Sequence, residues 1–131
     1  MLIIVSAKNV EEAYKNIVDK GKRNTYIFEE RGLQDFFFEY RDSFKSYEKY
    51  WELIPYGVSK ISNEDVFLIK EFAESVNEFI DEKISSNLEL ENRIIDRFNL
   101  SISKIRKYVQ SLIKLCDHAI KNNDDLYGIG D

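Results

Sequence analysis

Residues 64–83 constrain the fold most strongly, because apolar and acidic side chains separate there at a spacing of about 3.6 residues per turn. The apolar side carries Ile69, Phe72, Ala73, Val76, Phe79, Ile80 and Ile84. The other side carries carboxylates with no Lys or Arg among them, namely Glu64, Glu71, Glu74, Glu78, Asp81 and Glu82. Like charges at this spacing repel slightly and cost stability. The pattern predicts an amphipathic helix ending near Ile84 and favours an external role for its acidic face.

Length and composition predict one helical domain. The chain has 131 residues, of which 44% are hydrophobic and 14% aromatic, enough to build a single core. Pro occurs once and Gly five times, a balance that favours helices over a sheet sandwich with many tight turns. We therefore expect residues 1–131 to form a mainly α domain, a compact bundle of four to five helices.

The other expected helices also follow from apolar spacing. A heptad seam predicts a long helix over residues 33–54, ended by Pro55, with the seam positions Leu33, Phe37, Tyr40, Phe44, Tyr47, Trp51 and Ile54. Asn9 is expected to cap a first helix, with Glu12 three residues on. A shorter helix is expected over residues 90–98. The last helix begins at Ser101 or Ser103 and buries Cys116 in its apolar stripe.

The chain ends are less strongly determined. Residues 2–5 form an apolar run that fits either a buried strand or the lead-in to a helix, and residues 25–28 could form a second short strand. Two short N-terminal β-strands are thus an alternative to an entirely helical start. Residues 122–131 are polar and Gly-containing, and we expect them to form a flexible acidic tail.

Charge and cysteine content narrow the class of partner. The net charge is -5, and residues 29–100 carry nine basic and seventeen acidic side chains. A nucleic-acid binder normally presents a basic face, so we expect no nucleic-acid partner, and a basic protein partner fits better. The same net charge can also be explained without any partner, because it keeps the protein soluble. A single cysteine fits a reducing compartment, and no apolar run is long enough for a membrane span, so we expect a cytoplasmic protein.

Catalytic and metal-binding motifs are absent from the sequence. His118 is the only histidine, and its neighbour Asp117 points about 100° away around the predicted helix. No Glu-x-x-His pair, phosphate-binding Gly-rich loop or Gly-x-Ser-x-Gly motif occurs. We therefore expect no enzyme activity, no metal and no cofactor. An enzyme remains an alternative if Glu or Asp side chains turn inward beside Tyr or His118.

Phe67 stands out because helical spacing places it among carboxylates. A large aromatic rimmed by charges is typical of an interface hot spot, although Phe67 could instead pack under the loop at residues 55–61. The expected partner-binding residues are Glu64, Phe67, Glu71, Glu74, Glu78, Asp81 and Glu82.

These features together predict a small acidic binding protein that acts as a monomer or weak homodimer. Its size and charge fit a bacterial immunity or antitoxin-type protein, which neutralises a basic nuclease toxin by docking an acidic helix in the toxin's nucleic-acid site. The alternative from another class is a self-associating helical scaffold or adaptor that uses the aromatic heptad seam.

Overall fold

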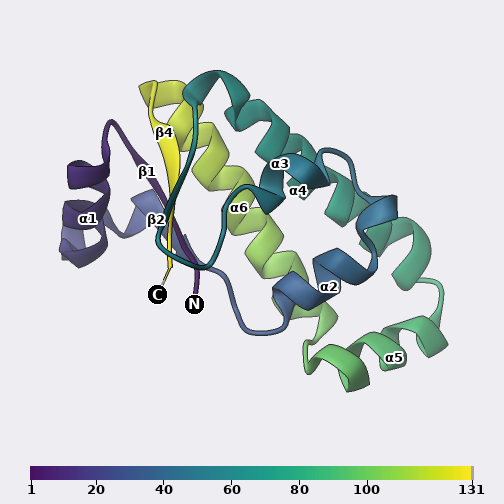
Figure 1. The fold of residues 1–131 in the computed structure, drawn as a ribbon. Coiled ribbons are helices and arrows are strands. Elements are labelled where there is room, and N and C mark those ends of the chain that lie inside the picture. Colours follow the sequence, from purple (N-terminus) through teal and green to yellow (C-terminus); the bar gives the residue numbers. More distant parts are fainter. Residues whose placement is uncertain (131) are drawn as a thin grey trace.

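The computed structural model describes residues 1–130, in which a four-stranded antiparallel sheet closes one end of a helical body (Figure 1). The strands are β1 (Ile3–Ala7), β2 (Tyr26–Phe28), β3 (Val58–Ile61) and β4 (Asp125–Ile129), in the order β2-β1-β4-β3. The α-helices are α1 (Val10–Val18), α2 (Leu33–Glu39), α3 (Tyr47–Trp51), α4 (Val66–Phe79), α5 (Leu88–Phe98) and α6 (Ile102–Asn122). Short 3-10 segments are η1 (Lys20–Thr25), η2 (Arg41–Ser43) and η3 (Asn63–Asp65), and η4 (Ile80–Ile84) is a π-turn. The mainly α prediction is confirmed, since 65% of the chain is helical.

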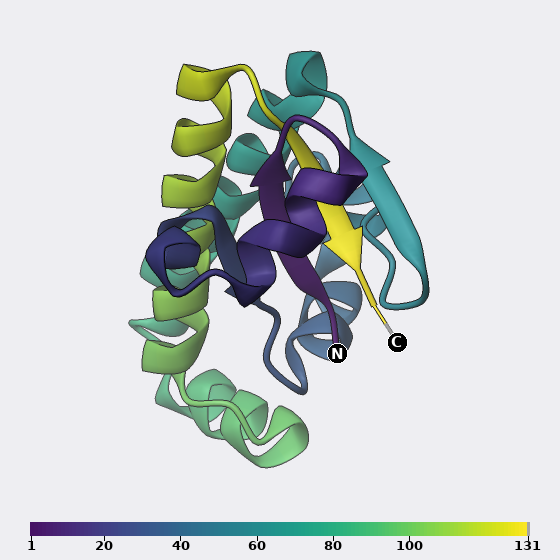
Figure 2. The same cartoon turned by 90° about the vertical axis from the view of Figure 1, so that its left-hand side faces the viewer.

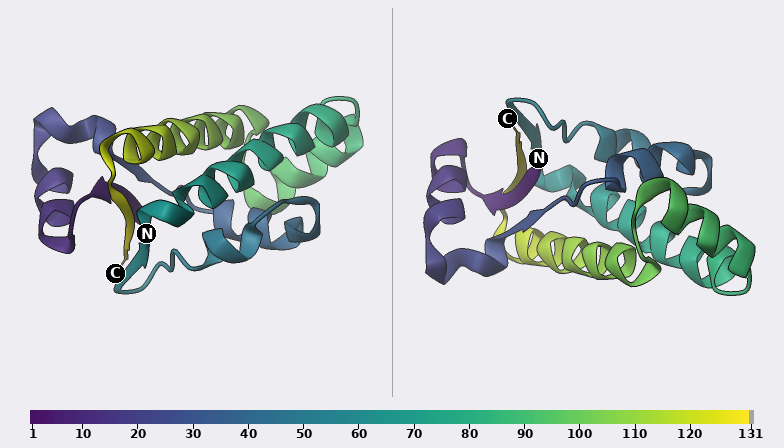
Figure 3. Two further views of the ribbon diagram at one scale, coloured as in Figure 1. Left: turned by 90° about the horizontal axis from the view of Figure 1, so that it is seen from above. Right: turned by 90° about the horizontal axis from the view of Figure 1, so that it is seen from below.

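The sheet separates two apolar cores of unequal size. Figures 2 and 3 show α1 and η1 on one face of the sheet and the remaining helices on the other. Because side chains alternate along a strand, Ile4 of β1 joins the large helical core while Val5 joins the small core under α1. In β4, Leu126 and Tyr127 divide in the same way. Both faces of the two central strands are therefore buried.

The N-terminal strand alternative is the correct one. Strand β1 pairs antiparallel with β2, with Ile3 opposite Phe28 and Val5 opposite Tyr26. The expected cap of the first helix also forms, because the side chain of Asn9 accepts a hydrogen bond of 2.9 Å from the backbone N–H of Glu12.

The expected flexible tail is wrong for residues 122–130, whereas Asp131 lies outside the described residues. Asn122 is the last residue of α6, and β4 pairs antiparallel with both β1 and β3. Gly128 suits this central position because a Cβ there would collide with the Ser59 hydroxyl. The glycine that made the segment resemble a loop allows the close approach of β3.

The single long helix expected over residues 33–54 is also wrong, because the chain breaks between α2 and α3. Phe44 is extended and Ser46 has a φ of 56°, while the intervening Lys45 N–H donates to the Ser75 hydroxyl at 2.9 Å. The break turns Tyr50 into the core and leaves Trp51 52% exposed, the reverse of the heptad pattern. It also raises the number of α-helices in residues 1–130 to six, above the expected four to five.

The seam residues of α2 and the segment after it pack within the chain's own core. Leu33, Phe37, Phe44 and Tyr47 are all buried, so they are not available for the self-association that the scaffold alternative places on this seam.

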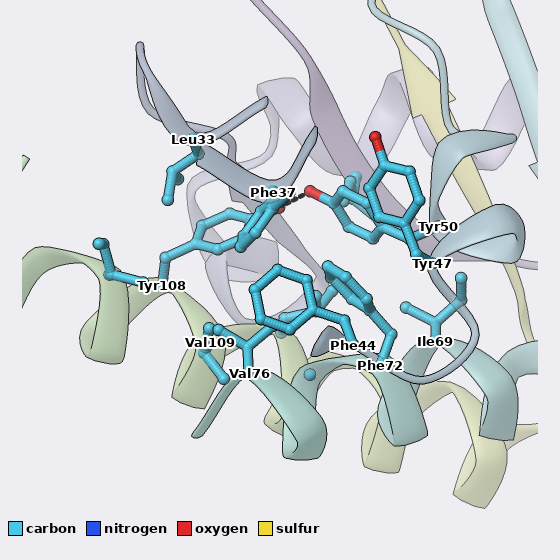
Figure 4. Close-up of a cluster of buried hydrophobic side chains, with 14 of the residues drawn as sticks. Leu33, Phe37, Phe44, Tyr47, Tyr50, Ile69, Phe72, Val76, Tyr108 and Val109 are labelled. Atoms are coloured by element: carbon cyan, nitrogen blue, oxygen red, sulfur yellow. Dashed lines mark hydrogen bonds between the residues drawn. The ribbon is translucent and has the colours of Figure 1, made fainter. Parts of the chain in front are cut away.

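Rings from α2, α3 and α4 form the aromatic centre of the large core (Figure 4). The Phe72 ring stacks on Tyr50 at 4.4 Å between centroids and meets Phe37 edge-on at 5.1 Å. On α6, Cys116 is fully buried as expected, and burial raises the pKa of its thiol to about 12. This thiol therefore stays protonated and acts as a small apolar group.

Gly32 precedes α2 with a φ of 93°, and a Cβ there would lie 2.6 Å from the carbonyl oxygen of Phe98. We expect Gly32→Ala to lower the free energy of unfolding by about 2–3 kcal/mol, because backbone strain and a collision act together. Gly57→Ala is the matched control, since its φ is 67° but no atom lies within 4 Å of the added Cβ. Urea denaturation should show a loss of about 1 kcal/mol for this control. Equal losses would mean that the contact with Phe98 has no effect.

Candidate functional site

The predicted partner-binding residues lie along one continuous segment made of η3, α4 and η4. The apolar face of this segment is buried as expected, and Ile69, Phe72 and Val76 are fully inaccessible. On the opposite side five of the predicted carboxylates are exposed and Glu71 is half-buried; the exposed ones are Glu64, Glu74, Glu78, Asp81 and Glu82. We call the six carboxylates and Phe67 the acidic face.

Positive side chains lie at one edge of the acidic face, where α4 packs against α6. Lys70 belongs to α4, and its Nζ pairs with Asp117 Oδ1 of α6 at 2.7 Å. Arg106 of α6 pairs with Asp81 Oδ1 at 2.9 Å. Asp81 is therefore neutralised by Arg106 of the same chain, and Lys70 places a cation beside the acidic face, which the apolar and acidic spacing of residues 64–83 did not predict.

The middle of the acidic face keeps its charge. Among the described residues, Glu71, Glu74 and Glu78 have no Lys, Arg or His nitrogen within the 4.0 Å of an ion pair. Three carboxylates on successive turns thus lie together without an ion pair in the described part of the chain, and of the three only Glu74 is close enough to Lys70 to contribute to the raised pKa of that lysine.

Phe67 stands at the N-terminal end of this row. Its side chain is 54% exposed, whereas its neighbour Val66 is fully buried. The alternative in which Phe67 packs under the loop at residues 55–61 is therefore wrong. An exposed aromatic ring next to unpaired carboxylates has the composition of an interface anchor.

His118 lines a polar pocket together with Ser6, Lys8, Asn122 and Asp124. Asp124 is buried and holds Ser6 through a 2.8 Å hydrogen bond and Lys8 through a 3.0 Å ion pair. Lys8 also donates to the carbonyl oxygen of Asn122 at the end of α6. This network joins β1 to the start of β4 and places a cation at the negative end of the helix dipole. The buried carboxylate of Asp124 is therefore already paired with the Lys8 ammonium.

A second buried carboxylate, Glu29, was not predicted. It directly follows β2, is 5% exposed, and accepts a hydrogen bond from the hydroxyl of Tyr50. The Tyr50 hydroxyl lies 2.6 Å from that of Tyr108 on α6, and Figure 4 marks this hydrogen bond with a dashed line. Because the single proton of Tyr50 is directed to Glu29, Tyr108 is the donor in the second bond. The carboxyl of Glu29, just after β2, and the hydroxyls of Tyr50 on α3 and Tyr108 on α6 thus form one hydrogen-bonded row, which we call the Glu29 network.

Burial controls the protonation of the three side chains in the Glu29 network. Desolvation raises the pKa of Glu29 to about 7, although hydrogen bonds from Tyr50 and Gln34 oppose the shift. Burial likewise raises the pKa values of Tyr50 and Tyr108, which stay neutral. An inward carboxyl beside tyrosine is the arrangement that the enzyme alternative requires, and it can exchange a proton near neutral pH.

The fold is therefore a mainly helical domain with a small antiparallel sheet, an acidic face on α4 and a buried carboxyl between α3 and α6. No protein-family model matches the chain, and neither the curated proteins nor the solved structures gave a match. None of the described helices combines the length and apolar character that crossing a membrane requires. Within residues 1–130, no three His, Cys, Asp or Glu side chains are grouped so as to hold a metal ion.

Proposed function

We propose that this protein is a small acidic binding protein whose acidic face docks a basic protein partner. The observation that supports this most directly is the row of three unpaired carboxylates, Glu71, Glu74 and Glu78, on a rigid helix. Asp81, at one edge of the acidic face, is instead paired with Arg106 of the same chain. The protein's own cations therefore neutralise part of that edge, whereas the three carboxylates in the middle form no ion pair among the described residues.

The geometry suits both attraction and anchoring. Helix α4 is packed into the core through Ile69, Phe72 and Val76, which holds the backbone that carries the carboxylates in place. Binding therefore loses little conformational entropy of this backbone. The summed field of the carboxylates accelerates the approach of a positively charged surface, an effect that salt weakens. Phe67 then offers an apolar contact at the end of the row.

In its most specific form, the proposal is a bacterial immunity protein that neutralises a nuclease toxin in the cytoplasm. A nuclease must carry a basic surface to hold nucleic acid, so an acidic helix can occupy that surface by charge mimicry. Support for this form comes from size and charge only.

The triple variant Glu71→Lys, Glu74→Lys, Glu78→Lys tests the proposal. We expect it to keep its fold and to bind the basic partner at least a hundredfold more weakly at low salt, chiefly through a slower association rate. The partner is first captured from the source cells with the unaltered protein, then purified for kinetics by surface plasmon resonance at several salt concentrations.

The matched control changes the same net charge elsewhere. Glu11, Glu89 and Asp96 are exposed on α1 and α5 and do not belong to the acidic face, and their replacement by Lys should weaken binding far less than the triple variant does. If both triple variants weaken binding equally, net charge rather than the acidic face governs association. If the α4 variant binds with unchanged affinity and salt dependence, the proposal is wrong.

A further inference from the structure

A pocket of about 360 Å³ opens beside Glu29, and none of its lining residues belongs to the acidic face. It is lined by residues from the start of the chain before β1, the segment from β2 to α2 and the loop after α3. Its volume falls in the range of small-molecule sites. The lining residues are Met1, Leu2, Glu29, Glu30, Arg31, Gly32, Gln34, Asp35, Pro55 and Tyr56.

The two carboxylates that are buried within residues 1–130 differ in their charge partners. Asp124 and Glu29 are both 5% exposed, but only Asp124 has a lysine ammonium beside it, that of Lys8 at 3.0 Å. No ion pair with a Lys, Arg or His side chain within residues 1–130 involves Glu29. The amino-terminal ammonium also acts on Glu29, and its effect on the pKa is the smallest of the causes. Buried carboxylates are normally paired with a cation, and within residues 1–130 Glu29 has no such pair with a Lys, Arg or His side chain.

The surroundings of Glu29 fix its position and set the charge of the pocket. Tyr50, itself hydrogen-bonded to Tyr108, donates to Glu29 Oε2, and the Gln34 side chain also lowers the pKa of the carboxyl. The ionisable groups around the pocket are the amino terminus, Glu30, Arg31 and Asp35, with Tyr50 and Tyr108 behind Glu29. With Glu29 ionised, the three carboxylates Glu29, Glu30 and Asp35 outnumber the two cations, Arg31 and the amino terminus, so the pocket carries a net negative charge and favours a positive ligand.

We infer that this pocket binds a small organic cation, a primary ammonium on a short apolar chain, with the Glu29 carboxylate as its charge partner. Leu2, Pro55 and Tyr56 provide apolar surface for the carbon part of the ligand. A desolvated, hydrogen-bonded carboxylate favours a charge-assisted bond to such an ammonium over a neutral hydroxyl.

Phenethylammonium is the probe, and 2-phenylethanol is its neutral isostere. Titration into the ¹⁵N-labelled protein should shift the backbone amide signals of residues 29–35, with saturable binding at least tenfold tighter for the ammonium. Glu29→Gln should weaken phenethylammonium binding at least tenfold and leave 2-phenylethanol unaffected. Asp35→Asn, which removes one charge from the rim of the same pocket, should weaken binding by less than threefold.

The pH dependence of the unaltered protein provides a test that needs no variant. An ammonium of this type stays protonated below pH 9, so its affinity should rise about tenfold per unit as Glu29 loses its proton and level off above about pH 7. The neutral isostere should show no such rise. The inference is overturned if the ammonium does not bind, if it binds no tighter than the isostere, if its affinity is independent of pH, or if Glu29→Gln binds it normally. None of these results bears on the acidic face, which a separate set of variants tests.

Discussion

Phe72→Ala is expected to lower the free energy of unfolding by about 3–5 kcal/mol, because a large, fully buried ring would be replaced by a cavity. Phe72 is 0% exposed and lies at the centre of the aromatic core. It stacks on Tyr50 at 4.4 Å and meets Phe37 and Phe44 edge-on at 5.1 and 5.8 Å. Truncation therefore removes contacts to α2, α3 and the break between them at once. Urea denaturation monitored by circular dichroism measures the loss.

Phe67→Ala is the matched control on the same helix. Its ring is 54% exposed, so its truncation should cost less than about 1 kcal/mol. The two variants remove the same atoms from one helix, and only the burial of the ring differs. Similar losses for both would mean that Phe67 is covered in solution, which would also remove it from the proposed binding face.

Helices α4 and α6 could be predicted because each repeats its apolar stripe over several turns. In α4, Ile69, Phe72, Val76 and Phe79 occur at spacings of three and four residues, and all are buried. Such a stripe needs only local sequence to be recognised. The same local pattern located the acidic side chains, but it did not show that Arg106 of α6 neutralises Asp81. That pairing depends on how two helices pack.

The pattern over residues 33–54 failed for a related reason. Phe37, Phe44 and Tyr47 are buried in one core, so their spacing fits a heptad although the chain between them is not one continuous α-helix. Periodicity reports which side chains face the core and not whether the backbone between them is continuous. The hydrogen bond from the Lys45 N–H to Ser75, 30 residues away, helps to hold the break and has no local signature.

Strands β3 and β4 and the Glu29 network depend on contacts between residues that lie far apart in the sequence. Strand β4 is five residues long and contains Gly128, and its partners β1 and β3 lie far from it along the chain. Short strands of this kind carry weak local signals. Glu29 precedes two charged residues and resembles a surface turn. It is buried only because Tyr50, 21 residues away, and then Tyr108, another 58 residues on, close over it.

We expect the Glu29 carboxyl to make the protein less stable as pH rises from about 4.5 to about 7. Its folded pKa is about 7, above the ordinary value of 4.5, because burial disfavours the ionised form. Below pH 4.5 both states are protonated and the stability from the raised pKa is fully present. As pH rises, the unfolded state loses its proton first, so stability falls by about 1.4 kcal/mol per unit. The total loss is about 3 kcal/mol and is complete above the folded pKa.

Glu29→Gln isolates this contribution because the amide keeps the shape and does not titrate. Between pH 5 and pH 8 the free energy of unfolding of the unaltered protein should fall by about 2–3 kcal/mol relative to the variant, as measured by urea denaturation at each pH. Glu30→Gln, at the exposed neighbouring position, should follow the unaltered protein. Parallel profiles for the unaltered protein and Glu29→Gln would show that Glu29 is solvated or already paired with a cation. The same result would remove the reason for a cationic ligand in the adjoining pocket, since an ammonium is attracted there only if burial leaves the carboxylate without a charge partner.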